Sequence, residues 1–389
     1  MIEKIYQKII VNMFFLFFMS PILSPFINGK TFYIYWIIPL LDYKFIKDLL
    51  KIRIKIKIFY LLLILLSYLL CQERYEEILR IILIVYMVLY LKYLKKINYL
   101  YLLYRYLNLN ILLAFFQFIF QYINPKISYM IGPTNISYIV WGKYAGPTFT
   151  NFYSIGLLNR SSGLSREVGF FSSLITITIL IYIYDTKVKK IKIQKLLFLL
   201  GYIISIAKMS IILPVYFILK KLKNKINKIP KLIFYNGILI FFIMVSKYMN
   251  SINFYNNNIS WTHRFGGYYV ITKYNIYDLF FSNLETVQEI TKKYSLIQIG
   301  SELKEIDTFT GLANIILHYG IFVYFVFILI LILLRIDNFK YLLFVLLCFN
   351  TSFITVTSYI VLNYYFILEL GERNEKKIKR LYKRIYIKK

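Results

Sequence analysis

Long apolar runs alternate with short, lysine-rich stretches along the whole chain of 389 residues. A helix that crosses a lipid bilayer needs about 20 mainly apolar residues, and many of these runs come close to that length. The pattern predicts an all-α integral membrane protein, a polytopic helical bundle of about 10–12 transmembrane segments with two long external loops. The predicted segments lie at 9–27, 31–46, 58–71, 77–94, 103–123, 167–184, 232–249, 314–335, 340–351 and 354–370, with a further stretch at 196–219.

Composition and charge point in the same direction. Hydrophobic residues make up 59% of the chain and the mean hydropathy is +0.61, well above the 45–50% apolar content typical of soluble domains. A formal net charge of +30 would suit a nucleic-acid partner. The cations, however, lie in short clusters between apolar runs, as the positive-inside rule requires, so we expect membrane lipids and no nucleic acid as partners.

Four basic clusters set the predicted topology. Each is short and borders an apolar run, which places it on the cytoplasmic side of the membrane. The N-terminus and the basic tail at 371–389 are then cytoplasmic as well, in a multi-pass membrane protein. The clusters lie at 44–57, 187–195, 220–231 and 373–389.

The stretch at 196–219 has two interpretations. It is long enough to cross the membrane once, but a single crossing would put one of its two lysine-rich flanks outside. A broken hairpin that returns to the cytoplasm, with Lys208 near its turn and Pro214 in its second arm, avoids this. We favour the hairpin. The chain then divides into N-terminal transmembrane helices (1–123), a first large external loop (124–166), central transmembrane helices with the hairpin (167–249), a second large external loop (250–313) and C-terminal transmembrane helices (314–370) before the tail.

Arginines gather at the external side, against the charge rule. Arg160 and Arg166 flank Gly163 in the first loop, and Arg264 lies in the second beside two glycines that we expect to be flexible. Arginine suits phosphate and pyrophosphate groups because its guanidinium is always charged and presents a planar fork of donors. We expect these three arginines to bind an anionic substrate, although arginines at such positions also reach toward lipid headgroups.

Further candidate residues adjoin these arginines. Glu167 could orient Arg160 or Arg166 or act as a general base, or could simply stabilise the start of the following helix. Lys208, which we expect to be buried in its segment, could bind substrate or only mark the hairpin turn. His263 precedes Arg264 and is a further candidate for substrate binding. Two cysteines and two histidines, far apart in sequence, predict no metal site and no cofactor.

Four stretches, in order, resemble the polysaccharide polymerases of the Wzy type, a part of the O-antigen ligase and polymerase superfamily. "GLSREVGFFSSLITI" is similar to their loop-to-helix signature, and "ISIAKMSIILPVYFIL" to their broken membrane segment, with Ala207-Lys208 in place of Ser-Arg. "WTHRFGGYYVI" resembles the start of their second external loop. "DTFTGLANIILHYGIFVYFVFILILIL" resembles that loop's exit. Val168 stands where a proline is common, and His318 where an acidic residue is frequent.

The resemblance implies a metal-independent membrane glycosyltransferase that builds O-antigen or capsule. It would move a growing glycan from undecaprenyl pyrophosphate onto a new lipid-linked repeat unit at the outer face of the bacterial cytoplasmic (inner) membrane. Donor and acceptor would both be undecaprenyl-pyrophosphate-linked oligosaccharides, with a chain-length regulator and a flippase as further partners. The implied catalytic residues are Glu167, Arg166 and Arg264. A lipid-linked oligosaccharide flippase and an O-antigen ligase are the alternatives. The ligases typically carry a His-Asn pair at the loop exit. By spacing it would fall near Phe309 and Thr310, so it is absent here, which favours a polymerase.

Overall fold

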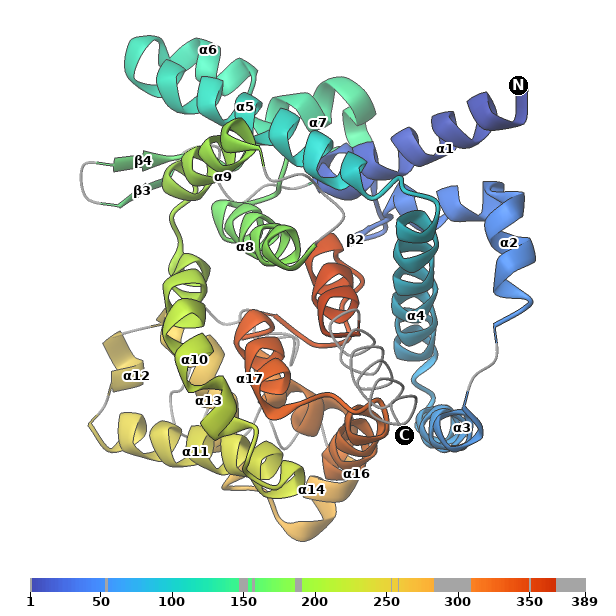
Figure 1. Ribbon diagram of the computed structural model, residues 1–389. Helices are drawn as coiled ribbons and strands as arrows, with labels where there is room; N and C mark the ends of the chain where they lie inside the picture. Colours follow the sequence, from blue (N-terminus) through green and yellow to red (C-terminus); the bar gives the residue numbers. More distant parts are fainter. Residues whose placement is uncertain are drawn as a thin grey trace, which may run out of the picture. The chain divides into compact units, whose positions relative to one another are not determined.

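The computed structural model of the chain is almost entirely helical (Figure 1). In the part of the chain that it describes, the β-structure consists of two short antiparallel hairpins, β1–β2 (Phe26–Ile27 and Lys30–Thr31) and β3–β4 (Tyr153–Ile155 and Leu158–Arg160). The all-α prediction is confirmed at this level. The described residues are 2–52, 55–146, 153–155, 158–185, 191–252, 254–257, 259–282, 309–349 and 351–368.

The chain folds into two compact units, each built from separated stretches of sequence. The first contains residues 1–52, 85–215 and 357–366, and the second contains 53–84, 216–356 and 367–389. Helices of the first unit are α1 (Ile2–Met19), α2 (Tyr43–Leu49), α5 (Tyr101–Ile123), α6 (Pro125–Met130), α7 (Pro133–Trp141), α8 (Val168–Tyr184) and α9 (Lys192–Ile204). Helices of the second are α3 (Ile56–Cys71), α11 (Lys231–Ser251), α12 (Phe254–Asn257), α13 (Ile259–Ile271), α14 (Ile276–Phe281), α16 (Gly311–Leu333) and α17 (Asn338–Leu347), while α4 (Tyr75–Lys96), α10 (Ile212–Ile226) and the helix Ser358–Leu368 have residues in both.

Three described helices are long and apolar enough to cross a membrane: α5, α11 and α16. Four shorter apolar helices, α3, α8, α17 and Ser358–Leu368, also lie close to predicted spans. Two predicted spans are not single helices. α1 ends at Met19, and the following prolines at 21 and 25 remove backbone donors. Residues 31–46 form two 3₁₀ turns, η2 (Ile34–Trp36) and η3 (Ile38–Leu41), before α2 begins.

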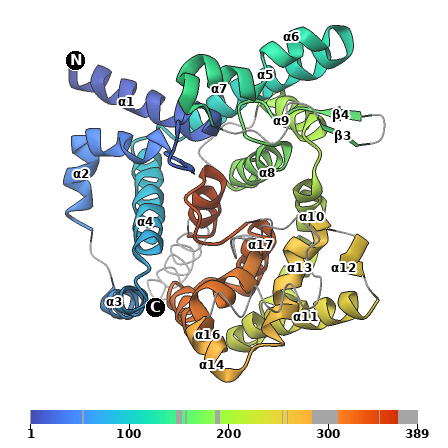
Figure 2. The ribbon, with the colours of Figure 1, turned by 180° about the vertical axis from the view of Figure 1, so that it is seen from behind.

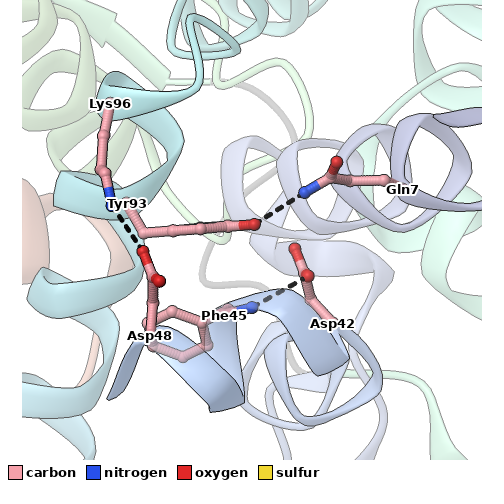
Figure 3. A network of polar contacts seen from close by, with 6 residues as sticks. All are labelled: Gln7, Asp42, Phe45, Asp48, Tyr93 and Lys96. Atoms are coloured by element: carbon pink, nitrogen blue, oxygen red, sulfur yellow. Dashed lines mark hydrogen bonds and ion pairs between the residues drawn. The ribbon is translucent and has the colours of Figure 1, made fainter. Parts of the chain in front are cut away.

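A polar network joins α1, α2 and α4 at one end of the first unit (Figure 3). Gln7 donates to the Tyr93 hydroxyl at 2.7 Å, and Asp42 caps α2 by accepting from the Phe45 amide at 3.2 Å. Lys96 binds the Asp48 carboxylate at 2.7 Å and thereby lowers the pKa of Asp48. These contacts bring the basic stretch that begins at residue 44 to the same end as the chain's N-terminal residues.

The opposite end of the first unit gathers the other connections. The Ile22 amide donates to the Leu164 carbonyl at 3.1 Å, and the Trp141 indole donates to the Leu23 carbonyl at 3.0 Å. The η1 turn (Pro21–Leu23) therefore contacts α7 and the segment before α8, which both belong to the predicted first external loop. The two ends of this unit carry the segments that the charge rule assigned to opposite sides.

The second unit has the same division between two ends. The Asn338 side chain donates to the carbonyls of Ile226 and Ile229 at 2.9 and 2.7 Å, which fixes the α16–α17 turn against the lysine-rich α10–α11 connection. About 20 Å further along α11, the Ser246 hydroxyl donates to the Phe265 carbonyl at 2.6 Å, and α13 lies beside α11 (Figure 2). Arg264, next to Phe265, is thus far from the lysines of 220–231 within this unit.

α16 is kinked at Gly320, which has φ +83° and ψ 164°, a conformation that only glycine adopts readily. A side chain at this position would collide with the Phe280 carbonyl at the end of α14. The Ser282 hydroxyl lies 2.7 Å from the carbonyl oxygens of both Leu317 and His318, in the turn before the kink. Irregular backbone in a membrane helix is tolerated where a neighbour satisfies it in this way.

Candidate functional site

The lip, residues 159–167, connects strand β4 to α8 and carries three of the predicted site residues. Arg160 is 7% exposed, although the sequence alone gave no reason to expect an arginine to be buried there. Its Nη1 donates to the Ile206 carbonyl at 2.8 Å. Arg166 and Glu167 are half-buried at the start of α8. The lip thus holds one arginine inside the unit and two further charged residues at its edge.

Three amide side chains on one face of α5 hold the lip; we call Asn110, Gln117 and Gln121 the amide row. Gln117 makes a two-way contact with Gly163: its Oε1 accepts from the amide at 3.0 Å and its Nε2 donates to the carbonyl at 3.1 Å. Asn110 accepts from the Leu164 amide at 2.8 Å. Gln121 donates to the Arg160 carbonyl at 3.2 Å and to the Ser161 hydroxyl at 3.1 Å.

The amide row was not predicted, because residues 103–123 were interpreted only as an apolar span. The signal was present: the three amides are seven and four residues apart, which places them on one helix face. Polar side chains inside an apolar helix are expected to face protein and not lipid. Here the three amides form hydrogen bonds with backbone groups of the lip.

Gly163 sits in a tight turn, in which the Ser165 amide donates to the Ser162 carbonyl at 3.0 Å. Its φ is +56°, and a Cβ at this position would collide with the Asn110 side chain. The backbone of the lip therefore approaches α5 as closely as it does only because residue 163 has no side chain.

The lip contacts the interruption in 196–219. That stretch is not one helix: α9 ends at Ile204, residues 205–207 are irregular, and the 3₁₀ turn η5 (Lys208–Ile211) leads into α10. Besides the Arg160 contact, the Ser161 amide donates to the Ile204 carbonyl at 3.1 Å. The hydroxyls of Ser172 in α8 and Ser210 in η5 lie 2.7 Å apart. Two motifs separated by about 40 residues of sequence thus meet in one unit.

Lys208 differs from its prediction. We expected a lysine buried in the segment, but the side chain is exposed at the first position of η5. An ammonium group is strongly hydrated and reaches water wherever its stem allows. The buried cation at the interruption is Arg160, from the lip.

Arg166 and Glu167 lie at the start of α8. The Arg166 guanidinium lies close to the Tyr33 hydroxyl. Glu167 is the N-cap residue of α8 by its backbone, but its side chain accepts no hydrogen bond from the first helical amides. The carboxylate is therefore not used as a helix cap.

His263 and Arg264 belong to the second unit, where both are half-buried on α13. We had interpreted the two adjacent glycines as flexible loop residues, and this was wrong. Gly266 and Gly267 are helical, and a Cβ on either would come within 3.1 Å of Phe309 or Ala313. They let α13 pack closely against the start of α16.

Polar groups cluster where α16 begins. Thr310 donates from its amide to the His263 carbonyl at 3.1 Å and from its hydroxyl to the Phe349 carbonyl at 2.8 Å. The Ser352 hydroxyl donates to the Asn314 side chain at 2.6 Å. This cluster fixes the backbone next to Arg264.

The predicted site residues thus form two sets. Arg160, Arg166, Glu167 and Lys208 lie in the first unit, and His263 and Arg264 in the second. That all three arginines bind one substrate stays a prediction. Among the described residues, no three His, Cys, Asp or Glu side chains are grouped so that they could hold a metal ion. No protein-family model, no curated protein and no solved structure matches this chain.

Proposed function

We propose that the chain is a membrane-embedded glycosyltransferase that polymerises a surface polysaccharide from lipid-linked repeat units at the outer face of the bacterial cytoplasmic membrane. The resemblance to Wzy-type polymerases supplies the substrate and reaction. One structural observation supports it above the others: Arg160 of the lip donates to the carbonyl of Ile206 in the interrupted segment. Two of the four stretches that carry the resemblance are thereby adjacent, as a shared site would require.

In the proposed reaction, the C1–O bond between the growing glycan and undecaprenyl pyrophosphate breaks. A hydroxyl of the acceptor sugar forms the new glycosidic bond to C1 and loses its proton. The bonding electrons leave with the pyrophosphate, so negative charge develops on its oxygens. Preorganised cations at the lip, Arg166 above all, stabilise this charge more in the transition state than in the ground state.

Glu167 is the proposed acceptor of the hydroxyl proton. Its carboxylate is half-buried beside Arg166 and is not used as the cap of α8. A neighbouring arginine could instead need this carboxylate for its orientation. Replacing Glu167 by Gln preserves shape and removes the charge, so normal polymerisation by Glu167→Gln would exclude both roles. A Gln variant that binds donor lipid but makes no polymer would favour the base.

The arginines provide the main test. We expect Arg166→Ala and Arg264→Ala to reduce polymer about ten- to a hundredfold at unchanged protein level, since a charge-assisted contact is worth about 1.5–3 kcal/mol. Lysine should restore little, because it lacks the planar fork. Arg105→Ala, which removes an exposed arginine of α5, is the matched control. Full activity of both variants would contradict the proposal.

A gene deletion separates the proposed activity from its rivals. Surface polysaccharide from the deletion strain is resolved on a gel and compared with the lipid-linked pool. Single repeat units on the surface would indicate a polymerase. Complete loss of surface glycan would indicate a flippase, and accumulation of lipid-bound polymer would indicate a ligase.

A further inference from the structure

Four cations gather around one carboxylate at the lysine-rich end of the second unit. Lys223 of α10, Lys231 of α11, Arg335 after α16 and Lys340 of α17 form what we call the basic cluster, with Asp337 at its centre. Lys223 and Lys231 are within electrostatic range of Lys340, and Arg335 is within range of Lys231. The local charge of these five residues is +3.

Lys340 is the unusual member. It is 3% exposed, and its Nζ lies 3.2 Å from Asp337 Oδ2. The other oxygen of Asp337 already accepts from the Lys340 amide at 2.9 Å as the cap of α17. Nζ makes no hydrogen bond of good geometry, although an ammonium has three donors. A buried ammonium that rests on one shared carboxylate is costly unless a further acceptor reaches it.

The surrounding backbone is fixed before any ligand binds. Asn338 and Asn227 tie the α16–α17 turn to the α10–α11 connection, the second through a 3.0 Å hydrogen bond from the Phe339 amide. Lys223 lies over the Phe339 ring, 5.6 Å from its centroid. Arg335 is exposed and has φ +58°, so its position after α16 is a defined turn. The cluster is therefore a preorganised set of cations from three helices and one turn.

Apolar surface adjoins the cations. Ile229, Leu232 and Ile233 precede and follow Lys231 and are 41%, 54% and 66% exposed. Leu222, next to Lys223, is 43% exposed. A soluble anion would use only the cations, whereas a molecule with a phosphate and acyl chains would use both surfaces.

We propose that the basic cluster binds the phosphate of an anionic glycerophospholipid, whose acyl chains lie along Ile229, Leu232 and Ile233. The inference rests on the proposed membrane location but not on the proposed reaction. Basic pockets beside transmembrane helices bind anionic headgroups in this way, and the lysine-rich flanks place this one in the cytoplasmic leaflet. The phosphate offsets the excess positive charge of the cluster, to which the buried Lys340 ammonium contributes.

The test measures lipid retention by the full-length protein in detergent, by native mass spectrometry with dioleoylphosphatidylglycerol and dioleoylphosphatidylcholine as probes. We expect the anionic lipid to bind on the order of tenfold or more tightly than the zwitterionic one. Arg335→Gln and Lys340→Met should each remove most of this preference. Lys228→Gln, which changes an exposed lysine of the same run, is the matched control and should keep it.

Arg335 is exposed, so its variant tests the site even if Lys340→Met unfolds the protein. Equal retention of the two lipids by the unchanged protein would overturn the proposal, as would a preference that Arg335→Gln leaves intact. Inorganic phosphate at millimolar concentration distinguishes the sources of the anion. If phosphate binds at the cluster and the lipid does not displace it, the lipid assignment is wrong. Polymer formation is measured separately, so failure of the proposed reaction would not affect this result.

Discussion

Single residues determine how the lip is built, and Gly163 is the clearest case. A positive φ and contact with Asn110 occur at the same position, so the turn needs a residue without a side chain for two independent reasons. Arg160 is buried three residues earlier, where its guanidinium donates to the Ile206 carbonyl in the irregular stretch after α9. A buried cation and a turn that requires glycine thus lie within residues 160–163.

We expect Gly163→Ala to lower the free energy of unfolding by at least about 2 kcal/mol, since it combines left-handed strain with displacement of Asn110 from the Leu164 amide. Gly29→Ala is the control. Gly29 also has a positive φ, +77°, but a Cβ there meets nothing within 4 Å. Gly29→Ala should lower the free energy of unfolding only by the backbone strain, about 1 kcal/mol. Thermal unfolding of both purified variants in one detergent measures the difference, and equal losses would exclude the packing role.

At this scale the sequence identifies charged residues better than their surroundings. Arg160, Arg166 and Glu167 stood out because charges are rare beside an apolar run. Whether a cation is buried depends on tertiary contacts, so Lys208 was expected inside and lies outside, while Arg160 is buried. Gly266 and Gly267 were interpreted as flexible because the sequence alone does not distinguish a glycine pair in a loop from one that lets two helices pack closely.

At the scale of elements, α5 combines two roles. Its length and apolarity suit a membrane span, and its amide row fixes the lip. A second amide contact, between Asn108 and Gln194 of α9, is reciprocal, with distances of 2.7 and 2.6 Å. α5 therefore joins α9 and the lip through separate polar contacts on one helix.

We expect Gln117→Leu to destabilise the protein by about 1–3 kcal/mol and to reduce polymer, because both polar groups of Gly163 lose their partner. The paired change Asn108→Leu with Gln194→Leu is the control. Removing both partners of a buried hydrogen bond is nearly neutral, and this pair does not touch the lip. Polymer yield per amount of folded protein is the measurement.

A double-mutant cycle with Arg160→Ala then separates positioning from mere stability. If the amide row acts by orienting the lip, the two changes together should reduce polymer less than the product of their separate effects. Strict multiplicativity would contradict the positioning role. Arg105→Ala in place of Arg160→Ala supplies the reference for an uncoupled pair.

Most helices were predictable because apolar runs of sufficient length are unambiguous, as α5, α11 and α16 illustrate. The region 20–42 was not, since its apolar residues are interrupted by prolines and a two-residue turn that hydropathy does not register. The predicted external loops also contain helices, α6 and α7 in the first and α13 and α14 in the second. Their short, aromatic sequences lack a clear period.

At the scale of the whole molecule, the contacts within each unit agree with predicted spans that cross the membrane in alternating directions along the chain. In the first unit, the start of α5 meets the end of α8 through Tyr104 and Asp185 at 3.2 Å, while its other end meets the lip. The helix Ser358–Leu368 runs in the same direction as α8, with Tyr359 beside Phe170 and Phe366 beside Tyr184. The predicted spans 167–184 and 354–370 also cross in the same direction.

The last prediction concerns 196–219. α9 begins beside the basic cluster at 187–195 and, in 13 residues or about 20 Å, already reaches the lip at Ile204. If the lip is external, the chain has reached the outer side before α10 begins, and the 15 residues of α10 that end in lysines must return. A single crossing would instead leave Lys228 outside.

We therefore expect Lys228→Cys to be protected from a membrane-impermeant maleimide in intact cells, and Tyr138→Cys, at a side chain 65% exposed on α7, to be labelled. Both are made with Cys71 and Cys348 replaced by serine, because Cys71 is exposed. Labelling of Lys228→Cys before the cells are permeabilised would exclude the hairpin, and labelling only afterwards, with Tyr138→Cys labelled throughout, would establish that the lysine-rich flank after α10 is cytoplasmic, as the hairpin requires.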